Sequence, residues 1–356
     1  MINLTLEFPE KYLKPLSKTV NAYDAVEKTH TGCGKLAVME ILCDAGNRTL
    51  LVIGSSGTGK SAVLRWLRDT IVRNKVWLDA VTIAGLKYLQ KQLNQMTCSV
   101  LIDDVSKGGT EYSQVMTVCS MGELIYSGFV KKYTGTLQLE IEGFRGSAIL
   151  NAQPLILKRI IRASEFETDI RDKVIRFYHI RKPINVVTNS PSDGIKYLYE
   201  YADVNISSGV MMSDLWKEGQ VIFRYEFSKA RAVEHYEALI RSCAMVNGRS
   251  SVEEADLWLV NELSKCFRLE SEIFSKEDLE GERKLDVNLL PLLSVLCTYR
   301  SYPITALLTD FQVKESRLYQ IISENKNYVA KIKNSGHDVI VPTSAGKELL
   351  TAIGEW

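Results

Sequence analysis

Short apolar runs and helical spacing alternate along the first half of the chain. The apolar runs predict buried strands at residues 50–53, 76–83, 99–102, 147–154 and 174–180. Between them, apolar residues recur every three or four positions, which predicts helices at residues 35–45, 62–67, 84–94, 111–125 and 158–169. Strands that alternate with helices are typical of an α/β domain with a parallel sheet. Residues 129–133 and 136–141 alternate around a Thr-Gly turn, which predicts a β-hairpin before the fourth strand.

The remaining segments are weakly patterned or helical. Residues 1–34 show little periodicity, and two prolines exclude any long helix there. From residue 225 onward the pattern is helical, and Ser251 and Glu254 have the spacing of a capping box before a second helix. The chain ends in helices and a hairpin at residues 289–299, 305–311, 314–324, 328–332 and 339–341. Two short helices followed by a β-hairpin predict a helix–turn–helix with a wing.

Composition narrows the class of protein without deciding it. The chain has 356 residues, of which 46% are apolar and 24% are charged, and its net charge is +1. This is ordinary for a globular protein of two or three domains, and nucleic-acid binding would have to come from local patches. Seven dispersed cysteines without a C-x-x-C pair predict reduced thiols. With no signal peptide and no apolar run long enough for a bilayer, we expect a cytoplasmic protein without membrane contact.

The residues that follow the first strand carry the clearest chemical motif. They are Gly54, Ser55, Ser56, Gly57, Thr58, Gly59, Lys60 and Ser61. Glycines let successive backbone N–H groups cradle phosphates, and the helix that follows adds a positive N-terminal dipole. In this P-loop pattern, Lys60 reaches the β- and γ-phosphates and Ser61 offers an oxygen to Mg²⁺. The sequence therefore predicts ATP and Mg²⁺ as cofactors.

Polar residues end two further strands and complete a predicted hydrolysis site. The third strand ends in Asp103 and Asp104, and the fourth ends at Asn151. We predict that Asp103 holds Mg²⁺ and that Asp104 orients or deprotonates the attacking water. Asp104 is shorter than the glutamate that many P-loop ATPases have there. Asn151 is placed to hold the same water near the γ-phosphate.

The order of these motifs resembles that of AAA+ ATPases. The resemblance covers residues 35–265 and includes the P-loop, the acidic strand, Asn151 as the first sensor and a basic turn before the last strand. In that family, an arginine of one subunit completes the neighbouring subunit's site, which implies an oligomeric ring, most often a hexamer. The candidates here are Arg171, then Lys173, with Arg176 nearby.

The hairpin resembles the insertion that helicases of this class project into a ring channel. The resemblance implies that Lys131 and Lys132 grip DNA. Paired lysines also protect exposed strand edges from aggregation, so a solvated edge hairpin is the alternative.

The helices after residue 225 resemble the AAA+ lid, and the string Glu237-Ala238-Leu239-Ile240-Arg241 resembles the lid of minichromosome-maintenance helicases. The resemblance makes Arg231 a nucleotide-contact candidate. We therefore expect these units: an N-terminal extension (1–34), an AAA+ core (35–183), a helical lid (184–269), a linker (270–284) and a winged-helix domain (285–356).

The predicted winged helix offers several polar residues to DNA. Its recognition helix and wing would present Lys314, Ser316, Arg317, Gln320, Lys331 and Lys333. However, residues 285–356 contain seven basic and seven acidic residues, so the electrostatic footprint is neutral and a protein-binding role is an alternative.

Three hypotheses for the whole chain follow. The first is a DNA helicase or translocase acting in replication, of the compact kind that viruses and mobile elements encode. The second is a replication initiator or helicase loader that uses ATP as a switch. The third is an ATP-dependent regulator whose winged helix binds a protein partner.

Overall fold

The centre of the molecule is a five-stranded parallel sheet. The computed structural model describes residues 6–133, 138–166, 170–180, 196–197, 203–270, 288–311, 313–334 and 336–354. The strands are β1 (Thr49–Ile53), β2 (Lys75–Leu78), β3 (Thr97–Ile102), β6 (Arg145–Ala152) and β7 (Val174–Tyr178), in the order β2-β3-β6-β1-β7. All four pairings are parallel, which confirms the predicted α/β fold class.

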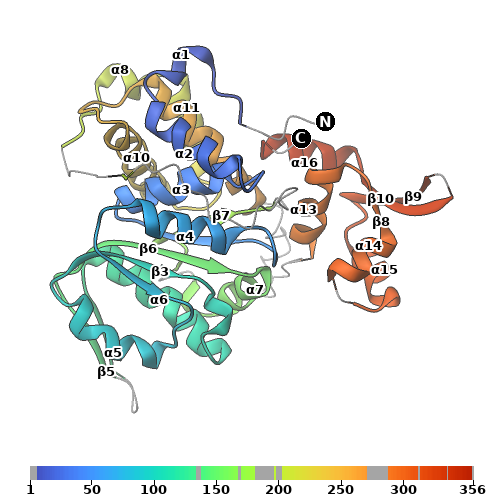
Figure 1. Cartoon of the computed structure of the whole chain (residues 1–356), viewed down its shortest axis with the longest axis horizontal. Coiled ribbons are helices and arrows are strands. Elements are labelled where there is room, and N and C mark those ends of the chain that lie inside the picture. The colour runs from blue at the N-terminus through green and yellow to red at the C-terminus, as the bar shows by residue number, and fades with distance from the viewer. Residues whose placement is uncertain are drawn as a thin grey trace.

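Helices cover both faces of this sheet, so its interior strand β1 is buried throughout. Helices α3 (Gly34–Ala45) and α4 (Lys60–Thr70) lie on one face, and α6 (Glu111–Ser127) lies on the other (Figure 1). Every residue of β1 is buried, as expected for a strand in the middle of a parallel sheet.

The boundaries of two elements differ most from the predicted ones, each for a local reason. Strand β2 ends at Leu78 and not at residue 83, because Thr82 instead caps α5 (Ile83–Leu93) by accepting a hydrogen bond from the Gly85 amide at 2.9 Å. Helix α7 (Pro154–Arg162) begins earlier than predicted, with Pro154 at its first position, where a missing N–H carries no penalty.

The N-terminal residues belong to a helical layer. Helix α1 (Glu10–Leu13) precedes α2 (Ser17–Glu27), which packs on α3 and on α10 (Lys229–Val246). The rest of the layer consists of α8 (Ser208–Met211), α9 (Asp214–Phe223), α11 (Glu254–Ser264) and the 3₁₀ turn η3 (Lys265–Arg268), which pack with one another and with α10. Tyr12 donates a hydrogen bond to Glu254 at 2.5 Å, and its ring lies 5.4 Å from that of Trp258. The capping box of α11 is formed by Glu253 and Asp256, two residues later than predicted.

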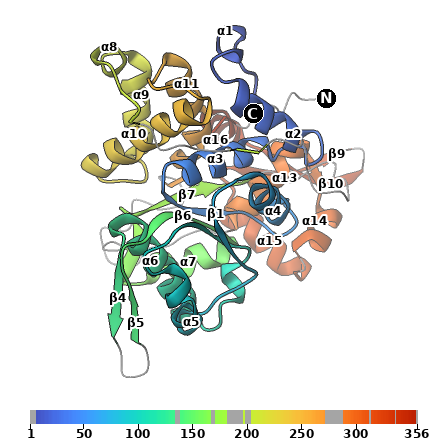
Figure 2. The ribbon, with the colours of Figure 1, turned by 60° about the vertical axis from the view of Figure 1, so that its left-hand side comes forward.

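The predicted hairpin is present as β4 (Val130–Tyr133) and β5 (Gln138–Ile141). Its strands pair antiparallel, with Lys131 opposite Glu140. Figure 2 shows this hairpin extending from the lower end of the core, beside α5 and α6. Residues 134–137, which join the strands, lie outside the described part of the chain.

The C-terminal unit contains the predicted elements in the predicted order. They are α13 (Leu289–Tyr299), α14 (Ile304–Phe311), α15 (Glu315–Glu324), β9 (Val329–Asn334) and β10 (His337–Pro342), and the helix α16 (Ser344–Ala352) follows them. An additional short strand, β8 (Tyr302–Pro303), pairs with β10 and makes a three-stranded antiparallel sheet. The unit lies beside the α/β core, with β9 and β10 extending away from it (Figure 1).

Two further observations concern the whole chain. All seven cysteines are buried among the described residues, and no disulfide joins any two of them. In the described ranges, no helix combines the length and the apolar character that a membrane span needs.

Candidate active site

The predicted chemical residues meet at one edge of the sheet. Because β1, β3 and β6 are parallel, their carboxyl ends lie side by side, with β6 between the other two. The register pairs Val52 with Asn151 and Ile102 with Leu150. Asn151 therefore lies between the loop that follows β1 and the two aspartates that follow β3.

The loop after β1 has the backbone that phosphate binding requires. Gly59 caps α4 with a φ of 88°, a left-handed conformation that favours glycine. At Gly54, a Cβ atom would lie 2.6 Å from the carbonyl oxygen of His179, so only glycine fits without a shift. Thr58 is buried, whereas Ser56 and Gly57 are exposed and Ser61 is half-buried in the first turn of α4.

Lys60 points back across this loop. Its Nζ donates hydrogen bonds to the carbonyl oxygens of Gly54 at 2.6 Å and Ser55 at 2.8 Å. Burial lowers the pKa of Lys60 to about 8, although the charges of Asp104 and Asp103 oppose that shift. The order of β1, β6 and β3 places the lysine and the two carboxylates at the same edge of the sheet.

Several polar atoms at this edge are buried without a hydrogen-bond partner. Among the described residues they include Oδ1 of Asp103 and both amide atoms of Asn151, which is 1% exposed. Buried polar groups are almost always satisfied in folded proteins, so such atoms are expected to meet a ligand, an ion or water. Asp104 is already engaged: its Oδ1 accepts a hydrogen bond from the Ser106 amide at 2.9 Å and caps the 3₁₀ turn η1 (Val105–Lys107).

This donor set fits a nucleotide with Mg²⁺. Ser61 and Asp103 supply the oxygen ligands that Mg²⁺ prefers, Lys60 supplies a cation for phosphate oxygens, and Asn151 supplies both a donor and an acceptor. The loop amides and the N-terminus of α4 add a favourable field for anions.

Three neighbouring residues were not predicted from the sequence. Glu40 of α3 is fully buried without a partner for either carboxylate oxygen among the described residues, and burial, with a contribution from Asp103, raises its pKa well above the usual value. An acid inside the apolar stretch from Leu36 to Cys43 was the available signal. Cys33 and His179 contact the loop from behind through the Thr58 carbonyl, and nothing in the sequence connects them.

Burial distinguishes the three candidates for a basic residue that acts on a neighbouring subunit's site. Arg176 is fully buried, and its Nε lies 2.7 Å from Oε1 of Glu270. Burial alone would lower the pKa of Arg176, but Glu270 and Glu226 raise it above its usual value. A side chain held in this way cannot reach a neighbouring subunit. Arg171 is exposed and Lys173 is half-buried in the turn that precedes β7.

The position of Arg231 does not fit the predicted nucleotide contact. Its NH1 is 2.6 Å from Glu234, which is also 3.7 Å from Arg48, and its guanidinium lies over the Tyr126 ring. Arg48 directly precedes β1 and Gly54 directly follows it, and a five-residue strand spans ~16 Å. Arg231 therefore lies at the opposite edge of the sheet, because α10 packs along α3 and not over the loop.

The hairpin lysines are both in ion pairs. Nζ of Lys131 lies 2.9 Å from Glu140 and 2.5 Å from Glu142. Lys132 lies 3.7 Å from Glu123 of α6, and its side chain is only 14% exposed. This geometry favours protection of the hairpin edge over a grip on DNA.

The C-terminal unit presents a mixed surface. Lys314, Ser316, Arg317, Gln320, Lys331 and Lys333 are all exposed. Arg317 lies 3.6 Å from Glu324, while Lys331 is 2.9 Å from Asp338 and 4.7 Å from the centre of the Tyr319 ring. Much of the basic charge on this face is therefore balanced by nearby acids.

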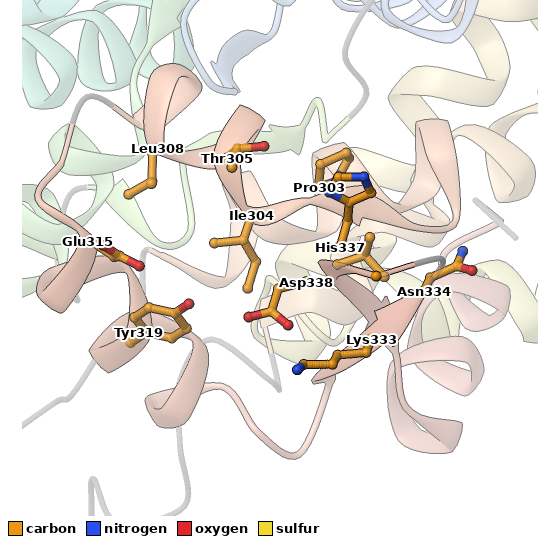
Figure 3. A pocket seen from close by; sticks show the side chains of 12 residues that line it. Pro303, Ile304, Thr305, Leu308, Glu315, Tyr319, Lys333, Asn334, His337 and Asp338 are labelled. Carbon is orange, nitrogen blue, oxygen red and sulfur yellow. The ribbon is translucent and has the colours of Figure 1, made fainter.

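A recess of about 670 Å³ opens between α14, α15 and the β9–β10 wing. Figure 3 shows Ile304, Tyr319 and Asp338 around it, with Glu315 at one end and Lys333 near the wing. The lining thus combines apolar, aromatic, acidic and basic groups.

Comparisons with known proteins add no family assignment. The chain matches no protein-family model, and no curated protein matches it in sequence.

Proposed function

We propose that the chain is an ATP-hydrolysing P-loop protein of the AAA+ type. The observation that carries the proposal is the meeting of Lys60, Asp103 and Asn151 at one sheet edge, where buried polar atoms of the latter two lack partners. A glycine-rich loop and a helix N-terminus at the same edge supply the phosphate cradle.

Each residue has a distinct role in this proposal. Lys60 leaves the loop carbonyls to bind phosphate oxygens, and Ser61 and Asp103 would hold Mg²⁺, which neutralises charge on the phosphates when bound. Asp104, already oriented by Ser106, positions or deprotonates the attacking water. Asn151 orients the same water from the neighbouring strand.

The experiment that tests the proposal measures nucleotide binding and phosphate release separately. Lys60→Ala should weaken binding of a fluorescent ATP analogue, whereas Asp104→Asn should keep binding and lower turnover by about 10²-fold or more, the usual contribution of a general base. Lys87→Ala, on the exposed side of α5, is the matched lysine control. Unchanged affinity in Lys60→Ala would sink the proposal.

The proposed output is work on DNA in replication, by a ring that acts as a helicase or translocase. The support is the order of the motifs along the chain together with a terminal helix–turn–helix-like unit in the expected position. The alternative, an initiator or loader, predicts slow turnover and specific duplex binding. Strand-separation and duplex-binding assays on the full chain distinguish these outputs.

A second candidate function is suggested by the recess of the C-terminal unit. Its lining combines apolar side chains and the Tyr319 ring with Glu315, Lys333 and the ion-paired Asp338, a mixed set that suits a protein partner better than a phosphate backbone. The DNA hypothesis predicts duplex affinity that falls steeply with salt and with Lys314→Ala/Arg317→Ala. The protein hypothesis predicts that Lys314→Ala/Arg317→Ala leaves any residual duplex affinity unchanged.

A further inference from the structure

Two buried side chains contact the phosphate loop at a single backbone carbonyl group, that of Thr58. The carbonyl oxygen of Thr58 accepts a hydrogen bond from Nε2 of His179 at 2.9 Å, and Sγ of Cys33 approaches it at 3.4 Å. Thr58 is 2% exposed, His179 is 4% exposed and Cys33 is fully buried. Because a carbonyl only accepts, His179 must carry its proton on Nε2 in this arrangement.

His179 is itself fixed against both ends of the loop. Its backbone amide donates to the carbonyl of Ile53, the last residue of β1, at 2.8 Å. Its own carbonyl faces Gly54, where it leaves no room for a Cβ atom. Movement of the loop and movement of residue 179 are therefore linked by direct contacts.

The C-terminal unit contacts the immediate neighbours of these two holding residues. Sγ of Cys297 in α13 lies 3.7 Å from the carbonyl oxygen of Ile180. Nζ of Lys35 donates to the carbonyl of Gly354, just beyond α16, at 2.9 Å. The unit thus touches the chain one residue after His179 and two residues after Cys33.

We propose that His179 and Cys33 are positioning residues for the phosphate loop, and that the C-terminal unit is coupled through them to nucleotide binding. The inference rests on the proposed nucleotide site and adds its regulation. Whatever the C-terminal unit binds then changes nucleotide affinity, and the nucleotide changes the affinity of the C-terminal unit by the same factor, as linkage requires.

The first test measures the affinity for a fluorescent ADP analogue. His179→Ala should weaken binding about fivefold to tenfold, the usual effect of losing one buried hydrogen bond, and His179→Gln should restore part of it because its amide can donate. His235→Ala is the matched control. His235 is also fully buried and bonds the Asp172 carbonyl at 3.0 Å, but at the opposite sheet edge, so its loss should leave ADP affinity unchanged.

The outcomes separate the inference from the proposed function. If Lys60→Ala binds ADP like the wild type, the nucleotide site itself is wrong. If Lys60→Ala loses binding while His179→Ala and His179→Gln both bind like the wild type, the site stands and the positioning role is overturned.

The second test addresses coupling to the C-terminal unit through hydrogen exchange of the full chain. ADP should slow amide exchange in peptides of α13, and Lys35→Met, which removes the contact to Gly354, should speed exchange in the loop peptide spanning residues 54–61. Coupling is refuted if α13 exchange ignores ADP in a chain that binds it. It is equally refuted if Lys35→Met leaves the loop unchanged.

Discussion

At the scale of single residues, Glu40 is the clearest test of the electrostatics of the site. Its carboxyl is fully buried beside Asp103, and its pKa is raised well above its usual value near 4.5. The folded chain therefore keeps a proton that the unfolded chain releases above about pH 4.5. This contribution to stability is fully present at lower pH and is lost as the pH rises.

Glu40→Gln should remove that loss. We expect the variant to match the wild type near pH 4 and to be more stable by about 1–3 kcal/mol near pH 8, the range for a buried polar group without a partner. Urea unfolding across this pH range measures the difference, with exposed Glu348→Gln as the control. A variant that is no more stable than the wild type at pH 8 would show that the carboxyl has a partner in solution.

The surroundings of a single residue could be predicted from the sequence where its neighbours follow from local pattern, but not where they come from distant parts of the chain. Asp103 and Asn151 end apolar strands, and parallel strands bring their carboxyl ends together, so their meeting follows from local pattern. Arg176 was counted among the basic residues of a turn, but Glu226 and Glu270, far along the chain, hold it in the core. Likewise, His179 reaches Thr58 only through the packing of β7 beside β1.

At the scale of elements, the hairpin β4–β5 can be tested by its lysines. Both ammonium groups are paired with carboxylates of the hairpin or of α6. We therefore expect Lys131→Ala/Lys132→Ala to keep whatever stimulation of ATP turnover single-stranded DNA gives the wild type. Phosphate release with and without single-stranded DNA is the measurement, and Glu140→Ala, which removes one acid opposite Lys131, is the companion variant.

A selective loss of DNA stimulation, with normal basal turnover, would reverse this conclusion and make the hairpin a DNA-gripping element. Loss of both activities together would instead indicate damage to α6, which Lys132 contacts through Glu123.

Elements with strong periodicity were predictable from the sequence. Elements that are short, or that depend on packing against another element, were not. The core strands and the helices of the C-terminal unit appear in the predicted order because their apolar faces are already periodic in sequence. Strand β8 has only two residues and exists through its pairing with β10. Helix α2 is stabilised by packing on α3, and the sequence pattern of residues 1–34 contains little of that information.

At the scale of the whole molecule, the arrangement of the helical layer changes which part of the chain is expected to lie near the nucleotide site. The sequence resemblance placed a basic residue of this layer on the nucleotide, but α10 runs along α3 and carries Arg231 to the far edge of the sheet. The C-terminal unit instead contacts residues next to those that hold the phosphate loop, because Cys297 lies against Ile180 and Gly354 accepts from Lys35. Such relative placement is decided by long-range packing, which motif order does not encode.

The last prediction concerns assembly, because the proposed ring requires a group from a neighbouring subunit. Arg171 is exposed in the turn before β7, and buried Arg176 is excluded, so Arg171→Ala should keep ATP affinity and lose about 10³-fold or more in turnover. Mixing Arg171→Ala with Lys60→Ala tests whether Arg171 acts between subunits. Each variant alone should be inactive. A random mixture contains interfaces that combine an intact Lys60 with an intact Arg171, so about a quarter of wild-type turnover should return if subunits pair head to tail. The mixture of Lys60→Ala with the double variant cannot form such interfaces and is the control. Recovery of turnover in the first mixture, and not in the control mixture, requires a site shared between subunits. Wild-type turnover by Arg171→Ala on its own would mean that Lys173 supplies the basic group or that no such group is needed.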